Sequence, residues 1–382
     1  MALLVVILQA ITLLATVIGS RSGSCDGGMK KVILSLALGT FGLGMAEFGI
    51  MGVLTELAHN VGISIPAAGH MISYYALGVV VGAPIIALFS SRYSLKHILL
   101  FLVALCVIGN AMFTLSSSYM MLAIGRLVSG FPHGAFFGVG AIVLSKIIKP
   151  GKVTAAVAGM VSGMTVANLL GIPLGTYLSQ EFSWRYTLLL IAVFNIAVMA
   201  SVYFSGAGYS RRGERKAART TSLFTQPGPV VNFRRHDVWQ RRCVCLVQLR
   251  KAIHDVYFRF FGNGDDLCIM FAGLGMVLGN LLSGRISGRY SPLRIAAVTD
   301  FIIVLALLML FFCGGMKTTS LIFAFICCAG LFALSAPLQI LLLQNAKGGE
   351  LLGAAGGQIA FNLGSAVGAY LRWYDADAGA GI

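Results

Sequence analysis

The sequence ALGVVVGAPIIALFSSRYS at residues 76–94 returns 197 residues later as GLGMVLGNLLSGRISGRYS at residues 273–291. Without gaps, 8 of the 19 positions are identical, and both copies pass from an apolar run into the tripeptide Arg-Tyr-Ser. An apolar run that ends in a basic loop is typical of a membrane span. The recurrence predicts a chain of two halves with the same topology, as in transporters built from parallel repeats.

A second, weaker match supports the same two halves. The pattern Gly-xxx-Gly-x-Tyr occurs at residues 171–177 and again at residues 364–370, an offset of 193 residues. The longer match pairs the second membrane span with the span near residues 267–284, and the shorter match pairs the fifth span with the one near residues 351–370. These are the eighth and eleventh spans once a missing crossing, described below, is counted. Two equal halves of this kind predict twelve spans in all.

Long apolar segments fill most of the chain. Hydrophobic residues make up 58% of the sequence and charged residues 11%, where a soluble domain has about 25% charged residues. A membrane helix needs about 20 predominantly apolar residues, whereas a β-barrel shows alternating segments of about ten. The pattern predicts an all-α polytopic membrane protein with ten recognisable spans, near residues 33–53, 67–89, 98–115, 119–145, 153–178, 187–204, 267–284, 295–313, 320–344 and 351–370.

The net charge of +15 lies mainly in segments between the spans. Lys30 and Lys31 precede the first span, and basic residues return after the second and fourth spans, while the intervening loops carry few charges. Basic loops stay in the cytoplasm, so the first span is expected to begin there. The charge therefore indicates membrane topology and does not indicate nucleic-acid binding.

One crossing is missing from this pattern. Six spans return the chain to the cytoplasm at residue 205, and the three arginines of residues 285–294 make the loop after the next span cytoplasmic as well. An additional outward span must therefore precede residue 267. Residues 205–266 instead contain 12 Lys or Arg and 5 Asp or Glu, with no apolar run long enough to cross.

Five strings carry a resemblance to a known family: AEFGIMGVLTELA (46–58), SSRYSLKH (90–97), GRLVSGFPHGAFFG (125–138), NLLGIPLGTYLS (168–179) and SWRYT (183–187). With them, residues 29–204 and 269–370 resemble the major facilitator superfamily in its drug–proton antiporter branch. The resemblance covers roughly 280 of the 382 residues. It implies two six-helix bundles in a bacterial inner membrane, with spans seven and twelve missing or garbled in this sequence, and alternating access that exports a small solute in exchange for protons.

The resemblance also implies a solute class and partners. A sugar such as arabinose or one of its derivatives is the implied solute, although the polar residues of the spans fit many substrates. The expected partners are the solute and the lipid bilayer, with the chain acting as a monomer. No Walker-type phosphate loop, Ser/His/Asp set or metal-spaced cluster occurs, so we expect no enzyme activity, no metal and no cofactor, with the proton gradient as the driving force.

Three stretches depart from the family pattern: 1–28, 205–268 and 371–382. Residues 205–268 are interpreted as a wrong reading frame between two compensating indels, because Arg-, Gly- and Pro-rich sequence replaces the central loop and span seven. A genuine basic loop is the alternative, but it leaves the missing crossing unexplained. The tail suggests a second frame error, and the N-terminal extension suggests upstream sequence joined before Met29, an added span or a signal segment.

Two charged residues inside predicted spans are candidates for proton coupling. Glu47 lies about two-thirds along the first span, and a carboxylate in hydrocarbon usually faces a cavity or a partner. Arg126 is the only Lys or Arg of the 119–145 helix, and the resemblance ties an arginine in this span to proton transfer. We expect Arg126 to be buried with Glu47 as its candidate partner. The alternatives are a snorkelling arginine and a protonated, merely packed glutamate.

Glycine patterns indicate close helix packing. Glycines follow Arg126 at intervals of four and form a stripe that another helix can approach closely: Gly130, Gly134 and Gly138. The fifth span resembles the antiporter signature, which implies the rocking interface between bundles, at Gly171, Pro173 and Gly175. The family usually has Gly directly before the proline, where this chain has Ile172. An ordinary proline kink is the alternative.

Four further polar residues are candidates for the cavity or the gate. His133 and Asn168 lie inside spans, where either could hydrogen-bond a sugar hydroxyl; for His133 an interhelical contact is the alternative. Arg92 and Lys96 match the basic loop that locks the family's inward gate through an acid–base pair. Ser91 replaces the family's acidic residue, so a weaker gate is expected. The alternative is plain positive-inside topology.

Two rivals to sugar export follow from the same sequence. A multidrug exporter of the same fold requires aromatic and apolar cavity walls, whereas sugar export requires paired Asn, Gln or His donors. The second rival is a non-transporting, truncated membrane protein, because spans seven and twelve are absent from this sequence and half a transporter has no opposing bundle to rock against.

Overall fold

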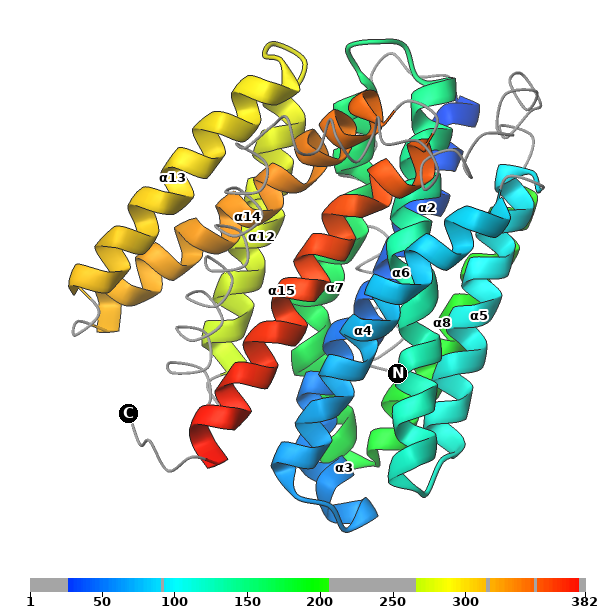
Figure 1. The fold of residues 1–382 in the computed structure, drawn as a ribbon, viewed down its shortest axis with the longest axis vertical. Coiled ribbons are helices and arrows are strands. Elements are labelled where there is room, and N and C mark those ends of the chain that lie inside the picture. The colour runs from blue at the N-terminus through cyan, green and yellow to red at the C-terminus, as the bar shows by residue number, and fades with distance from the viewer. Residues whose placement is uncertain (1–26, 91–92, 206–265, 314–316, 347–348, 378–382) are drawn as a thin grey trace.

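The computed structural model describes residues 27–90, 93–205, 266–313, 317–346 and 349–377. Within these ranges all regular structure is helical, which confirms the all-α class (Figure 1). The elements are α2 (Gly27–Phe48), η1 (Gly49–Val53), α3 (Leu54–Val61), α4 (Ile65–Ser90), α5 (Leu95–Leu115), α6 (Tyr119–Ile147), α7 (Val153–Glu181), α8 (Trp184–Phe204), α12 (Asp266–Ile286), α13 (Pro292–Cys313), α14 (Lys317–Asn345) and α15 (Glu350–Asp377).

Each of the ten predicted spans is helical in the structure. Eight of the described helical segments are long and apolar enough to cross a membrane, and α12 adds a shorter apolar stretch at Phe271–Ile286. The first predicted span, 33–53, differs in detail. Its α-helix gives way at Gly49 to the 3₁₀ turn η1, and α3 then continues the segment to Val61.

Serine side chains set the starts of two helices. Ser94 and Ser183 accept hydrogen bonds from backbone N–H groups at the N-termini of α5 and α8. An N-cap of this kind satisfies a donor that the helix itself leaves unpaired. Both helices therefore begin about one turn earlier than the starts at 98 and 187 that the apolar pattern predicts.

The two halves repeat one packing pattern. In the first half α4 and α5 pack along α6, and in the second half α12 and α13 pack along α14. α12 thus takes the place of α4, as the repeated sequence predicts. In the first half α2 also packs against α7, and α8 packs against α5. The described helices of the second half include no counterpart of α2 or α8.

The three atypical stretches fall mostly outside the described residues. Residues 1–26, 206–265 and 378–382 are not described, so the interpretation of these stretches as frame errors or joined sequence stays a prediction. Two edges differ from the predicted boundaries, because α12 already begins at Asp266 and α15 continues to Asp377.

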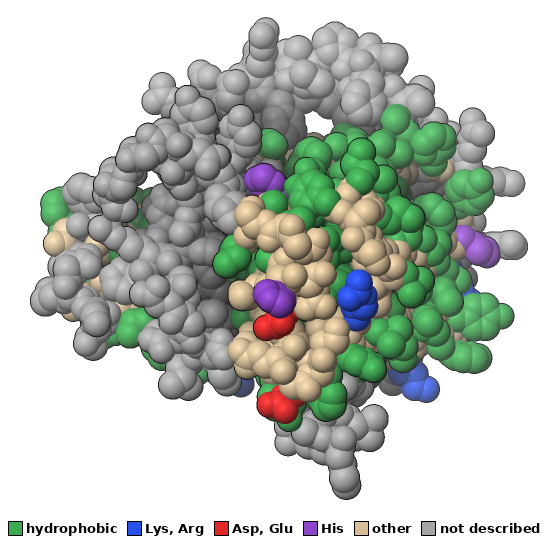
Figure 2. Space-filling model, turned by 90° about the horizontal axis from the view of Figure 1, so that it is seen from below, with side chains coloured by type: hydrophobic (Ala, Val, Ile, Leu, Met, Phe, Trp, Pro, Cys, Tyr) green, Lys and Arg blue, Asp and Glu red, His purple; other side chains and the backbone are tan. Residues whose placement is uncertain are grey.

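The basic loops identify the two ends of the helix bundle. The C-terminal ends of α4, α6, α12 and α14 lie at the upper end in Figure 1. This end is termed the cytoplasmic end, because the sequence that follows these helices is basic and basic loops stay in the cytoplasm. Figure 2 views the opposite end, where few of the described side chains are Lys or Arg. Between these ends the halves meet where α7 packs on α12 and where α15 packs on α4 and α6.

Candidate functional site

Glu47 lies at a break in the first membrane segment. It is the penultimate residue of α2 and is 5% exposed. The break is η1, where a side chain at Gly52 would overlap backbone atoms of Ile172 and Thr176 in α7. A 3₁₀ piece within a helical segment often marks a functional hinge. The buried carboxylate therefore lies next to a point where the segment can bend.

His133 connects this carboxylate to a second buried side chain. Its Nε2 lies 3.7 Å from Glu47 Oε2, and its Nδ1 lies 2.9 Å from the Tyr75 hydroxyl oxygen. The Tyr75 hydroxyl is also within donating distance, 3.3 Å, of the Leu43 carbonyl oxygen. His133 and Tyr75 are both buried. Of the two readings of His133, the structure supports the interhelical contact, which joins α2, α4 and α6.

Arg126 lies beside the same cluster. It is 1% exposed, and it donates to the Ala46 carbonyl oxygen at 2.8 Å and to the Met71 carbonyl oxygen at 3.3 Å. Its guanidinium carbon lies 4.5 Å from the centroid of the Tyr75 ring, a cation–π geometry. The arginine is therefore buried as predicted and does not snorkel. Because Ala46 directly precedes Glu47, the guanidinium binds α2 one residue from the carboxylate.

The glycines of α6 admit two neighbouring helices. A side chain at Gly130 would overlap the carbonyl oxygen of Tyr75 in α4. Gly134 faces the same helix, and Gly138 faces Leu351 near the start of α15. The predicted stripe of close approach is confirmed: small residues allow α4 to bring Tyr75 into the cluster and allow α15 of the other half to reach α6.

The signature of the fifth span packs elsewhere than predicted. Gly171 and Gly175, on either side of Pro173, face η1 of the same half, so this close approach lies within one bundle. The contact between the halves lies at another position of α7, where Leu169 meets Gly273 of α12. The prediction of a rocking interface at the glycines was wrong because α7 is packed on more than one face, and the signature does not say which face meets which neighbour.

The remaining predicted site residues do not share one site. They are Asn168, Lys96 and Arg92. Asn168 is buried, and its amide nitrogen contacts the sulfur of Met276 in α12 across the two halves. Lys96 Nζ lies 4.5 Å from the centroid of the Tyr203 ring, which links α5 to α8 within the first half. Arg92 lies outside the described residues, so the basic-loop gate stays a prediction.

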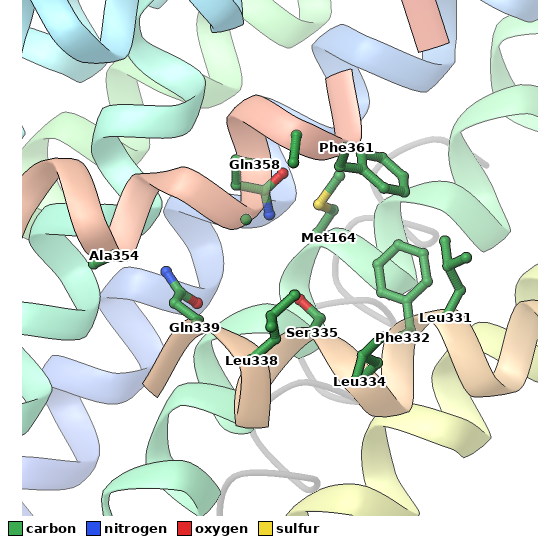
Figure 3. Close-up of a pocket in the computed structure, with 12 residues that line it drawn as sticks. Met164, Leu331, Phe332, Leu334, Ser335, Leu338, Gln339, Ala354, Gln358 and Phe361 are labelled. Carbon is green, nitrogen blue, oxygen red and sulfur yellow. The ribbon is translucent and has the colours of Figure 1, made fainter. Parts of the chain in front are cut away.

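A pocket of about 80 Å³ lies between α14, α15 and Met164 of α7 (Figure 3). A water molecule needs about 10–15 Å³ on this measure, so the pocket has room for several waters or part of a small solute. Its polar lining comes from Ser335 and Gln339 of α14 and Gln358 of α15, among aliphatic and aromatic side chains of the same helices.

The two glutamines of the pocket have unused acceptor atoms. The Oε1 atoms of Gln339 and Gln358 are buried and have no hydrogen-bond partner among the described residues. The other end of the Gln339 amide does have one, because Nε2 donates to the Phe137 carbonyl oxygen at 2.8 Å. Buried acceptors are rarely left without a partner. Neighbouring side chains enclose both oxygens in this structure, and a hydroxyl group of a solute that reaches them would supply the missing donor.

Sequence reasoning missed Tyr75 and the two glutamines of the pocket. Their signal is the one that identified Glu47 and Asn168, a polar side chain within an apolar span. Which of several such residues share a site depends on how the helices face one another, and hydropathy carries no information on that.

Comparison with known proteins agrees with this architecture. The Major Facilitator Superfamily matches residues 36–369. Over 342 residues the chain is 81% identical to AraJ of Escherichia coli (strain K12). This alignment covers 90% of this chain and 87% of AraJ. Over 341 residues it is 31% identical to the inner membrane transport protein YdhP of Escherichia coli O157:H7, covering 88% of this chain and 86% of YdhP.

Solved structures share the fold. The proton:xylose symporter XylE bound to 6-bromo-6-deoxy-D-glucose matches with a TM-score of 0.69 at 15% identity, over 92% of this chain and 89% of XylE. FucP in the outward conformation matches with a TM-score of 0.64 at 13% identity, over 92% of this chain and 93% of FucP. With eight apolar spans among its described residues and inner-membrane relatives, this is a multi-pass protein of a bacterial inner membrane, and the chain belongs to the Major Facilitator Superfamily of transporters.

Proposed function

We propose that this protein is a secondary active transporter that exports a small neutral solute, such as a sugar or a sugar derivative, in exchange for protons. The observation that carries the proposal is the buried contact of His133 with Glu47, at 3.7 Å, in a bundle that borders an amide-lined pocket. The transporter would act as a monomer and would need no cofactor, with the proton gradient as its driving force.

The buried cluster supports proton coupling. Ionisable groups inside a membrane are costly to keep, and they mark proton relays in many transporters. Glu47 Oε2 and His133 Nε2 lie 3.7 Å apart, which is an ion-pair distance when the histidine is protonated, while the Tyr75 hydroxyl lies 2.9 Å from the other ring nitrogen of the histidine. Uptake of a proton changes the charge of this cluster beside the buried Arg126. Such a change alters the cost of burying the cluster, and it can therefore favour movement of one half against the other.

The pocket supports a neutral, hydroxylated solute. Its polar groups are the Ser335 hydroxyl and the amides of Gln339 and Gln358, and none of the described side chains that line it is charged. The two unpartnered amide oxygens favour a ligand that donates hydrogen bonds. XylE, which shares the fold, is a xylose symporter bound to a deoxy-sugar, so a sugar is compatible with this architecture.

A second candidate is export of apolar drugs. The same pocket has walls of Leu331, Phe332, Leu334, Leu338 and Phe361, which suit aromatic or aliphatic compounds. For a drug, however, the two unused amide oxygens would stay unsatisfied, and this difference favours the sugar.

Transport by the full chain in lipid vesicles tests the proposal. With the cytoplasmic face outward and an acidic lumen, we expect radiolabelled L-arabinose to accumulate inside the vesicles. Glu47→Gln should abolish the gradient-driven accumulation but keep exchange of labelled for unlabelled sugar, because the solute pocket is untouched. The control is Glu181→Gln, which removes an exposed carboxylate at the end of α7 and should change neither activity.

Other outcomes identify which part fails. Unchanged accumulation in Glu47→Gln removes Glu47 from the coupling mechanism. Accumulation only under the opposite gradient replaces antiport by symport. Accumulation of ethidium but not of arabinose favours the drug exporter. No movement of either compound by the full chain favours the non-transporting membrane protein.

A further inference from the structure

Two buried amide side chains join the halves of the molecule. Gln339 Nε2 of α14 donates to the Phe137 carbonyl oxygen of α6 at 2.8 Å. Asn280 Nδ2 of α12 donates to the Ala158 carbonyl oxygen of α7 at 2.9 Å. Gln339 is 4% exposed and Asn280 is fully buried, so water does not compete for either bond.

Both bonds lie toward the cytoplasmic end of the bundle. Gln339 and Asn280 are within about two turns of the cytoplasmic ends of α14 and α12, and Ala158 is within two turns of the start of α7. Alternating access requires the two halves to separate at this end when the site opens to the cytoplasm. The two bonds therefore belong to the state that is closed on that side, and they must break on opening. A neutral amide–carbonyl bond has a modest net strength, which suits a contact made and broken in each cycle.

Gln339 differs from Asn280 in one respect, because it also lines the pocket. Figure 3 shows it on α14 beside the pocket, with Gln358 on the neighbouring α15. The nitrogen of the Gln339 amide donates to the Phe137 carbonyl oxygen, while its oxygen has no hydrogen-bond partner in the described part of the chain. One side chain thus bonds the other half through its amide nitrogen and also forms part of the pocket wall.

The Phe137 end of this bond leads to the buried cluster. The ring of Phe137 stacks on His133, with centroids 5.2 Å apart and planes 18° apart, and His133 lies one turn away on α6. His133 is the residue in contact with Glu47. A continuous set of contacts therefore runs from the pocket through Gln339, Phe137 and His133 to the carboxylate.

We propose that Gln339 is a positioning residue that couples solute binding to closure of the cytoplasmic end. Its amide nitrogen latches α14 to α6, and its amide oxygen accepts a hydrogen bond from a solute hydroxyl, which fixes the amide in the orientation that the latch requires. The role of the amide nitrogen, which is to hold α14 against α6, depends only on the transporter fold. The role of the oxygen rests also on the proposed hydroxylated solute.

Distances between the cytoplasmic ends of α6 and α14 test the latch without any solute. Spin labels are introduced as genetically encoded amino acids at Lys146 and Gln344, both exposed, in the full chain in lipid nanodiscs. We expect one short distance for the parent protein. Gln339→Met and Asn280→Leu should each add a longer-distance population, because each removes one bond between the halves. An unchanged distance distribution in Gln339→Met overturns the latch.

Addition of L-arabinose to the same samples separates the two amides. In Asn280→Leu the solute should restore the short distance, because the pocket amide is intact. In Gln339→Met it should not, and binding of L-arabinose measured by calorimetry should weaken by about five- to tenfold. Equal restoration in both variants overturns the coupling role of Gln339 and leaves it as a structural bond.

Two further results keep the roles apart. If the parent protein does not bind L-arabinose by calorimetry and Asn280→Leu keeps its longer-distance population when the sugar is added, the proposed sugar is wrong. The role of the amide oxygen falls with it, while the solute-free distances still decide the latch. If Gln339→Met does not fold, Gln339→Leu replaces it. That variant also removes both the donor and the acceptor of the amide, so it should also populate the longer distance.

Discussion

The two halves of the molecule use their buried polar side chains differently. In the first half Arg126, Tyr75 and His133 contact one another or the backbone of neighbouring helices, and they gather around Glu47. Buried polar atoms without a hydrogen-bond partner among the described residues occur in both halves, for example Arg126 Nη2 and Gln339 Oε1, but in the second half the amides of Gln339 and Gln358 line a pocket. The difference indicates a first half built to hold charge within the membrane and a second half built to receive a hydrogen-bonding solute.

The two halves also differ in how tightly their helices pack, around the buried cluster and around the pocket. On α6 of the first half, a side chain at Gly130 would overlap the backbone of α4. On α15 beside the pocket, a side chain at Gly357 would meet nothing closer than Leu342 Cδ1, at 3.7 Å. Space around the cluster is therefore filled, while space around the pocket is not. Two pairs of substitutions test this contrast, and a third pair measures a contact at the edge of the first half.

The largest contrast is expected between Arg126→Met and Gln358→Met. Arg126→Met removes two charge-assisted hydrogen bonds to buried carbonyl groups and should destabilise the protein by about 3 kcal/mol. Gln358→Met removes an amide whose oxygen has no partner and should change stability by less than about 0.5 kcal/mol. Melting temperatures of both variants in one detergent provide the measurement. Equal losses would remove the distinction between the halves.

A smaller contrast is expected for one substitution at two glycines. Gly130→Ala should cost about 1–3 kcal/mol, because α4 and α6 must separate to admit the methyl group. Gly357→Ala should be neutral or stabilising by up to about 1 kcal/mol, because alanine favours the helix and the methyl group has room. Thermal melting again decides, and a loss at Gly357 as large as that at Gly130 would contradict the open packing of α15.

The smallest effect is expected at the edge of the first half. Lys96→Gln removes the cation from the Tyr203 ring and should cost about 0.5–1 kcal/mol, since Tyr203 is largely exposed. Tyr203→Leu should cost a similar amount, and the double variant should lose little more than either single variant. Losses that simply add would show that the two side chains act independently. This pair thus measures the strength of one contact that lies outside the buried cluster of the first half.

Several features of the site followed from the sequence. Glu47 and Arg126 stood out because charged side chains are rare in apolar spans, and the structure buries both. The glycine stripe of α6 was visible as a repeat of four. The glycines beside Pro173 were assigned to the wrong neighbour, and Tyr75 and Gln339 were passed over. In each of these cases the residue type was informative, but its partner lies on a helix that is distant in the sequence.

The sequence by itself determined the class of the protein, the positions of ten spans and the relation of α4 to α12. These features depend on local hydropathy, loop charge and repeated strings, which need no knowledge of distant contacts. Only the tertiary structure decided that His133 meets Glu47, that Arg126 donates to Ala46 and Met71, and that Gln339 lies between the pocket and α6. These contacts depend on which face each helix turns toward its neighbours, and close packing across the whole bundle sets that choice.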